Sequence, residues 1–150
     1  MTSEPDYGLS VGGRVFVEGW PCTIVGAYRY SDGDFGWIEF RIAHPEGERW
    51  LTDANRPAPG WKFWRPATPP LPERDADEVE VEVDGVSYRL VRSGTAGYVV
   101  LGSSGETSSG VVDYADYEAG EMMIGFERFD GGIWEVHEGR WLPAWDVAPG

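Results

Sequence analysis

The chain has 150 residues, the size of one ordinary domain, and its 26 acidic and 12 basic residues give a formal charge of −14. Nucleic acids carry the same sign of charge, so this composition argues against DNA or RNA as a partner. The single cysteine, Cys22, excludes an internal disulfide and a cysteine-rich zinc site, and it is typical of a reducing compartment.

No targeting segment is evident in the sequence. Residues 1–10 are acidic and lack the apolar region of a secretory signal, and no run approaches the roughly 18 apolar residues of a membrane helix. We therefore expect a cytoplasmic protein that does not span a membrane, with residues 1–8 flexible. The charge is uneven, because residues 1–70 hold nine acidic and seven basic side chains whereas residues 71–150 hold 17 and five.

Alternation of apolar and polar residues dominates the chain, and no window repeats apolar residues at helical spacing over three turns. The alternating runs are, in chain order, Val15 and Val17; Ile38, Phe40 and Ile42; Val79, Val81 and Val83; and Ile124 and Phe126. In the third run the intervening residues are Glu78, Glu80 and Glu82, which we expect to face water. These runs predict antiparallel strands with one buried and one solvated face.

Acidic residues followed by glycine separate many of these runs. Glycine supplies the positive φ of a tight hairpin, and aspartate hydrogen-bonds the turn backbone. Six such signals predict a meander of about eight to ten short strands. The pairs are Glu18-Gly19, Asp32-Gly33, Glu46-Gly47, Asp84-Gly85, Asp130-Gly131 and Glu138-Gly139.

Proline is concentrated near the middle of the chain. Six of the 11 prolines lie between Pro57 and Pro72, and a charged stretch follows at residues 73–77. Because proline has no N–H to donate to a sheet and favours extended, solvated chain, residues 57–77 are predicted to be a connector.

The sequences on either side of this connector are alike. Val15–Val25 matches Val81–Val91 position by position, Ile38-x-Phe40 is echoed by Ile124-x-Phe126, and Gly47-x-x-Trp50 by Gly131-x-x-Trp134. We interpret residues 11–65 and 78–147 as two related β-meander units; the alternative is that unrelated hairpins share a turn pattern. The predicted fold is a single all-β domain over residues 1–150, antiparallel and barrel-like, in one barrel or two.

Short motifs at both ends resemble the bacterial domain-of-unknown-function family 4178 over most of residues 9–147. They are Val11–Val15 with Val25-Gly26, Trp37–Phe40, Glu48–Leu51, Glu127–Phe129, Gly132–Val136 and Gly139-Arg140. The resemblance implies no established activity. Family members are often encoded beside a polyamine aminopropyltransferase-like protein and small membrane proteins, so the resemblance makes a cationic ligand or a membrane-protein partner an expectation.

Catalytic and metal motifs are weak. A nucleophile would need Cys22 near His44 or His137, and a buried structural cysteine is the simpler interpretation. The Gly102–Gly110 stretch lacks a P-loop ending, and the acidic groups at 32–34 and 113–118 do not fit a calcium loop. We therefore expect no catalytic residue, no cofactor and no metal.

Two aromatic groups are candidate binding elements. An amine cation binds well where carboxylates and indole faces occur together. We therefore expect a ligand site formed by Glu127, Trp134, Glu135, Glu138 and Trp141. The alternative is that these residues form a solvated acidic face over a tryptophan-rich core. Trp61 and Trp64 lie in the proline-rich segment, where they either pack on the domain or dock a partner.

The sequence as a whole favours a non-enzymatic interaction or binding module that uses its acidic surface to bind a protein partner. Two alternatives stay open: a protein that binds a small cation of the polyamine type, and an uncharacterised enzyme with a histidine-containing cleft.

Overall fold

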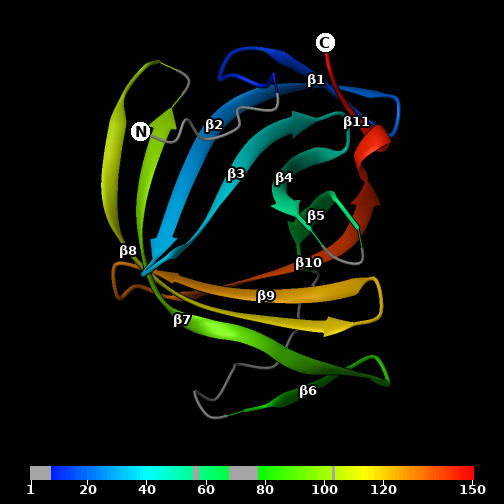
Figure 1. Ribbon diagram of the computed structural model, residues 1–150, viewed down its shortest axis with the longest axis vertical. Helices are drawn as coiled ribbons and strands as arrows, with labels where there is room; N and C mark the ends of the chain where they lie inside the picture. Colours follow the sequence, from blue (N-terminus) through cyan, green and yellow to red (C-terminus); the bar gives the residue numbers. More distant parts are fainter. Residues whose placement is uncertain (1–7, 56–57, 68–77, 103) are drawn as a thin grey trace.

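The computed structural model describes residues 8–55, 58–67, 78–102 and 104–150 (Figure 1). In these ranges the chain forms strands and one 3-10 helix, η1, and no helix has the length and apolarity that a bilayer span requires. The elements are β1 (Arg14–Val17), β2 (Trp20–Asp32), β3 (Phe35–His44), β4 (Gly47–Ala54), β5 (Gly60–Pro66), β6 (Glu80–Val83), β7 (Val86–Gly102), β8 (Thr107–Ala119), β9 (Met122–Phe129), β10 (Trp134–Pro143), η1 (Ala144–Asp146) and β11 (Val147–Pro149).

All strands belong to one antiparallel sheet in the order β11-β1-β2-β3-β4-β5-β10-β9-β8-β7-β6. An additional pairing joins residues 26–31 of β2 to residues 97–102 of β7 and closes eight strands, β2–β5 and β7–β10, into a ring. Figure 1 shows β2 and β3 on one side of this ring and β7, β8 and β9 on the other. The predicted all-β, antiparallel, barrel-like fold is confirmed.

The acidic–glycine signals mark real hairpin turns at most of their positions. Glu18, Asp84 and Asp130 each have a φ of 51°, and the glycine that follows each of them also has a positive φ. Two consecutive residues with positive φ form the turn that matches the right-handed twist of paired strands. The turn predicted at Glu138-Gly139 is wrong, because both residues lie inside β10.

The predicted connector is also wrong for residues 60–66, which form β5 between β4 and β10. Residues 61–65 contain no proline, so each of their N–H groups is available to a neighbouring strand. Residues 57 and 68–77 of the connector lie outside the described part of the chain, as do residues 1–7 of the N-terminal segment that we expected to be flexible.

Apart from β11, the strand order is symmetric about the β5–β10 pair: β1–β5 follow one another on one side of it, and β10 back to β6 on the other. Irregular pairing occurs at Val25 in β2 and at Val91 in β7, which are matched positions in the two sequence units. The other two sequence matches do not fall on corresponding strands of the two units. Ile38 lies on β3, the third strand of the first unit, but Ile124 lies on β9, the fourth strand of the second. Trp50 on β4 and Trp134 on β10 differ by one strand in the same way. Duplication therefore stays a prediction.

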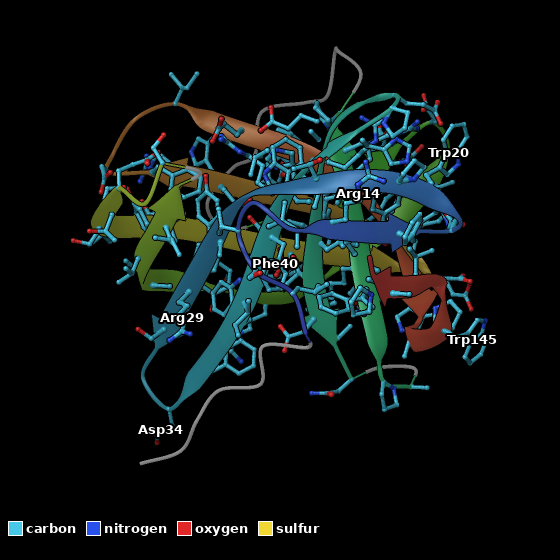
Figure 2. All side chains as sticks on the ribbon, turned by 90° about the horizontal axis from the view of Figure 1, so that it is seen from above. Arg14, Trp20, Arg29, Asp34, Phe40 and Trp145 are labelled. Atoms are coloured by element: carbon cyan, nitrogen blue, oxygen red, sulfur yellow. The ribbon has the colours of Figure 1, made fainter. Side chains whose placement is uncertain are left out.

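The buried apolar residues form three clusters. The third, of Tyr30, Ala96, Val112 and Tyr114, packs against Trp37 at the ring interior, and the two larger ones lie on the other face of the ring strands. The first gathers β1–β5 and Leu142, and the second gathers β6–β10. Figure 2 shows Phe40, from the first cluster, inside the fold, whereas Trp20 and Trp145 lie at its periphery. On β6, Val81 is buried as predicted, but Val79 precedes the strand and is 70% exposed, so its predicted burial is wrong.

Neighbouring residues of a strand face opposite sides of a sheet. Ile38 and Phe40 of β3 belong to the first cluster, so Trp37 and Glu39 point to the opposite face, into the ring. Tyr117 of β8 and Phe126 of β9 belong to the second cluster, and their strand neighbours point inward in the same way. The ring interior is thus a third environment, separate from both cores.

We predict that Gly139→Ala lowers the free energy of unfolding by about 1–3 kcal/mol, because overpacking a filled interior forces its neighbours to move. A Cβ at this position would lie 2.6 Å from the buried indole ring of Trp64. Urea unfolding followed by tryptophan fluorescence measures the effect. The matched control is Gly97→Ala on β7, where the nearest atom is 3.8 Å away; equal stability of the two variants would contradict the prediction.

Candidate functional site

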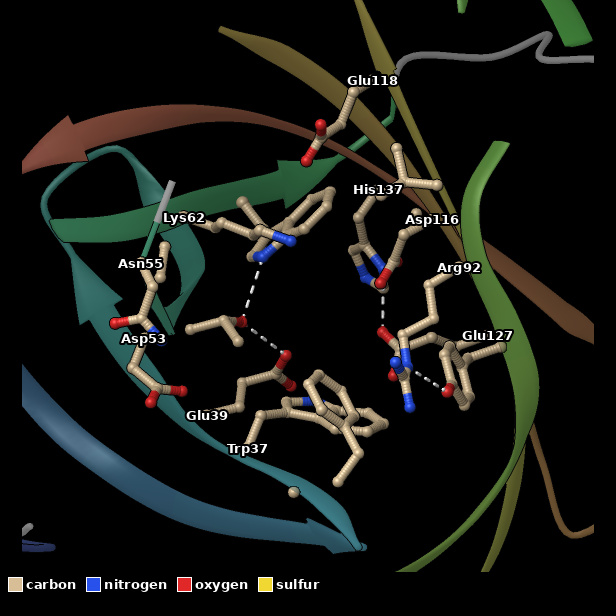
Figure 3. A pocket seen from close by; sticks show the side chains of 18 residues that line it. Trp37, Glu39, Asp53, Asn55, Lys62, Arg92, Asp116, Glu118, Glu127 and His137 are labelled. Carbon is tan, nitrogen blue, oxygen red and sulfur yellow. Dashed lines mark hydrogen bonds and ion pairs between the residues drawn. The ribbon is translucent and has the colours of Figure 1, made fainter. Parts of the chain in front are cut away.

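A cavity of about 560 Å³ lies inside the ring. This volume falls in the range of small-molecule sites, roughly 300–1,000 Å³. Residues of β3, β4, β5, β7, β8, β9 and β10 line it, so it depends on closure of the whole ring. The charged or titratable side chains along its walls are Glu39, Asp53, Lys62, Arg92, Asp116, Glu118, Glu127 and His137 (Figure 3).

Glu39 of β3 is the most enclosed of these acidic groups, with only 8% of its surface exposed. Its two carboxyl oxygens accept hydrogen bonds from the hydroxyls of Tyr30, at 3.2 Å, and Thr52, at 3.1 Å. The Trp64 indole N–H in turn donates to the Thr52 hydroxyl at 3.1 Å. Burial raises the pKa of Glu39 to about 7, although these hydrogen bonds act in the opposite direction.

Glu127 of β9 reaches the same cavity beside His137 of β10 (Figure 3). The Nδ1 atom of His137 lies 3.6 Å from Glu127 Oε1, and its ring packs edge-on against Trp50 with centroids 4.5 Å apart. Burial raises the pKa of Glu127 well above its ordinary value, and the charges of Glu39, Asp116 and Glu135 raise it further. Burial also lowers the pKa of His137 to about 4, so this contact joins a neutral imidazole to a carboxyl group at neutral pH.

Asp116 of β8 lines the same cavity as Glu39 and Glu127. Burial raises its pKa, the charges of Lys62 and Arg92 lower it, and the charge of Glu118 raises it. Arg92 Nε donates to the Tyr114 hydroxyl at 2.9 Å. Among the described residues Lys62 forms no hydrogen bond or ion pair, so its charge acts on Asp116 from beyond contact distance.

Aromatic side chains form the remaining walls of the cavity. Trp37 stacks on Tyr30 with ring centroids 4.8 Å apart and meets Tyr114 edge-on at 5.0 Å. The ring of Trp64 fills space beside Gly125 and Gly139, where an added Cβ would come within 3.2 Å and 2.6 Å of it. Because these glycines lack a side chain, the indole can lie flat against β9 and β10 while its N–H reaches Thr52.

The cavity therefore combines five carboxyl groups with two cationic side chains and indole walls. In a partly enclosed site the excess of acidic groups favours a bound cation, and carboxyl groups with raised pKa values also suit proton transfer. Within the described ranges, no three or more His, Cys, Asp or Glu side chains are grouped so that they could hold a metal ion.

Of the five residues predicted to bind a ligand, Glu127 lines the cavity and the other four lie elsewhere. Trp134 packs against the second apolar cluster beneath the Arg128 guanidinium, Glu135 is exposed, and the Trp141 indole donates to the Ala58 carbonyl at 3.2 Å. Glu138 pairs with Arg65 at 3.0 Å in a second cavity of about 610 Å³. Glu135 lies directly opposite Glu127 in the β9–β10 pair and its charge raises the pKa of Glu127, but it does not line the cavity. The five residues therefore do not form one site, because Trp134, Glu138 and Trp141 have their contacts outside the ring cavity.

Trp61 and Trp64 are 5% and 7% exposed, respectively. The prediction that they form an exposed docking element is therefore wrong, and the alternative that they pack within the domain is confirmed. Trp61 lies in the first apolar cluster, and Trp64 lines the cavity.

The residues considered for nucleophilic catalysis lie in different surroundings. Cys22 is buried in the first apolar cluster, and burial raises the pKa of its thiol. His44 lines the second cavity, where its Nδ1 atom accepts a hydrogen bond from the Glu46 N–H. Only His137 meets a carboxyl group inside the ring.

Sequence reasoning missed Glu39, Lys62 and Arg92 as lining residues and considered Asp116 only as a metal ligand. One signal was available, since Glu39 lies between two buried residues, Ile38 and Phe40. The same pattern is produced by a strand whose second face meets water, so it does not distinguish a solvated face from an enclosed one.

Comparison with known proteins gives one match. The family model described as "Domain of unknown function (DUF4178)" matches residues 10–144. Neither the curated proteins nor the solved structures contain a significant match to the chain.

We predict that Glu39→Gln makes the protein more stable than wild type at pH 8, by about 1–3 kcal/mol, and changes its stability less at pH 4.5. A carboxyl group whose pKa rises from 4.5 to about 7 on folding contributes stability that is present below pH 4.5 and lost as pH rises through 7. Glutamine mimics the protonated group at every pH. Chemical unfolding at the two pH values measures the difference.

His137 contributes a pH dependence of stability with the opposite sign to that of Glu39. His137, whose pKa falls from 6.5 to about 4, contributes stability that is present above pH 6.5 and lost as pH falls through 4. Comparing each variant with wild type at the same pH largely cancels this contribution. Glu82→Gln, on an exposed position of β6, is the control and should show no pH-dependent effect; a constant effect of Glu39→Gln at both pH values would contradict the prediction.

Proposed function

Because the chain belongs to the family described as "Domain of unknown function (DUF4178)", whose description assigns no activity, we propose a function from the ring cavity alone. The protein is a binding protein for a small organic amine cation. The observation that carries this proposal is a partly enclosed cavity in which acidic side chains outnumber cationic ones and indole rings form part of the walls.

The charge balance of the cavity supports a cationic ligand. Glu39, Asp116 and Glu127 each lie in surroundings where burial raises the pKa, which means that their charged forms lack sufficient compensation. An ammonium group within hydrogen-bond distance would supply that compensation. Hydrogen bonds between charged partners contribute more than neutral ones, roughly 1.5–3 kcal/mol each.

The shape and walls of the cavity favour an organic amine over a single small ion. A volume of about 560 Å³ accommodates a molecule of many atoms. Trp37 and Trp64 present indole surface to the cavity, and indole faces attract ammonium groups and pack against alkyl chains. A diamine or polyamine satisfies both requirements, because it places positive groups at intervals along an apolar chain.

The acidity of the surface supports the same ligand class. A net charge of −14 creates a negative potential around the molecule, which raises the local concentration of cations and speeds their arrival. Salt screens this long-range attraction but acts less on contacts inside the cavity.

A second candidate function is acid–base catalysis on an amine-bearing substrate. The contact between His137 and Glu127 inside the cavity favours it, since a neutral imidazole and a carboxyl group with a raised pKa can exchange protons with a bound molecule.

We predict that putrescine and spermidine raise the melting temperature of the protein saturably, and that butane-1,4-diol, which matches putrescine in length but carries no charge, does not. Asp116→Asn should weaken diamine binding about ten- to a hundredfold, because it removes one charged partner. Calorimetric titration at constant ionic strength measures both effects.

The matched control is Glu138→Gln, whose carboxyl group pairs with Arg65 in the second cavity. This variant should bind the diamines within about twofold of wild type, since most surface pairs contribute little. Equal weakening by the two variants would show that the general negative charge, and not the ring cavity, binds the amine. No response to any amine would contradict the proposed function.

For the catalytic candidate, we predict that incubation with acylated diamines leaves them intact. The acyl group occupies one nitrogen and removes its charge, so hydrolysis would appear in a mass spectrum as release of the free diamine. Release that is lost in His137→Gln, while the variant still binds putrescine, would favour catalysis over simple binding.

A further inference from the structure

We propose that the ring cavity takes up its amine in exchange for a proton carried by one of two carboxyl groups that line it, Glu39 and Glu127. This inference rests on the proposed function and adds how binding is regulated: the affinity for the amine rises with pH, and each binding event releases a proton to solvent. The exchange needs no redox partner. The carboxyl O–H bond breaks, the proton passes to buffer, and the ammonium group takes its place beside the carboxylate.

The geometry places two carboxyl groups in one enclosed space without a cation between them. Glu39 from β3 and Glu127 from β9 point into the same cavity from different walls of the ring (Figure 3). Glu39 is held by two hydroxyl donors, and Glu127 contacts only the imidazole of His137 among the described residues. Neither partner is an ammonium or a guanidinium group.

Two carboxylates that share an enclosed site do not both ionise readily, because each charge disfavours the other and burial disfavours both. The charge of Glu39 is among those that raise the pKa of Glu127, and burial raises the pKa of both groups. The pair therefore holds a proton near neutral pH when the cavity contains no cation.

Other charged and titratable groups face the pair from every surrounding strand. They are Tyr28 and Tyr30 on β2, Arg41 on β3, Glu48 and Asp53 on β4, Lys62 on β5, Arg92 on β7, Tyr114, Asp116 and Glu118 on β8, and Glu135 and His137 on β10. Arg41 is engaged by Glu48, with Nε 3.5 Å from Oε1, and Arg92 by Tyr114. Asp116 and Glu135 add negative charge, which makes a proton on the pair more favourable.

The direction of the pH effect follows from these groups. A bound ammonium stabilises the carboxylate form and lowers the pKa of the pair, so a proton leaves when the amine enters. Below neutral pH the pair is protonated in a larger fraction of the molecules. The amine must then displace a proton more often, so its apparent affinity falls. His137 becomes charged only near pH 4, where it would repel the amine and weaken binding further.

Calorimetric titration of the full chain with putrescine tests the exchange on the wild-type protein. Putrescine keeps both of its protons between pH 5.5 and 8, so any proton released comes from the protein. At pH 7 the observed heat should differ between phosphate and HEPES buffers in proportion to their ionisation enthalpies. The dissociation constant should rise as pH falls, by up to about tenfold per pH unit below pH 6.

Two variants separate the pair from the rest of the cavity. Glu127→Gln removes one member of the pair, and it should reduce proton release and flatten the pH dependence of the dissociation constant. Glu118→Gln removes a carboxylate of the same cavity outside the pair, and it should weaken binding while preserving proton release.

Each outcome decides one point. Putrescine binding with equal heats in both buffers, and with the same dissociation constant from pH 5.5 to 8, would overturn the proton exchange and leave the proposed function in place. No binding at any pH would overturn the proposed function and the exchange with it. Loss of proton release in Glu118→Gln but not in Glu127→Gln would overturn the assignment to this pair.

Discussion

Closure of the ring is the constraint on which the rest of the molecule depends. Within the ring, the β5–β10 and β2–β7 pairings join the strands of the first half to those of the second. Once they form, each ring strand has one face toward an apolar cluster and the other toward the interior. Phe40 and Glu39, or Phe126 and Glu127, are neighbours in sequence but occupy different environments for this reason.

The interior face is not an extension of the core. Filling a closed space with carboxyl groups opposes folding unless they are protonated, hydrogen-bonded or paired, because enclosure disfavours charge. Glu39 accepts hydrogen bonds from the hydroxyls of Tyr30 and Thr52, and the Trp64 indole N–H orients Thr52 by donating to its hydroxyl. Trp64 holds that position because Gly125 and Gly139 leave room for its ring. A chain of steric and polar contacts across β2, β3, β4, β5, β9 and β10 thus fixes one carboxyl group and leaves others facing open space.

The sequence was sufficient for the strands and most turns, because alternation and acidic–glycine pairs are local signals. Prediction from the sequence was wrong where the same local pattern can arise for two different physical reasons. Gly139 follows an acidic residue as a turn glycine does, but it is required by the Trp64 ring. Residues 61–65 were not recognised as a strand, because prolines precede and follow them in the sequence. The cavity depends on pairings between strands distant in sequence, so Glu127 was recognised as a candidate while Glu39, from the other half of the chain, was not.

The uneven charge of the two halves takes on a different meaning once the ring is closed. The cavity draws on both halves, with Glu39 and Lys62 from the first and Asp116, Glu127 and Arg92 from the second. Much of the additional acid of the second half lies elsewhere, as at Glu80 and Glu82 on β6, where the side chains are exposed. These charges act on a cation only at long range and are screened by salt, whereas the enclosed groups act at contact. In the proposed binding function, surface acidity therefore affects how often a cation arrives, and the ring interior determines which cation stays bound.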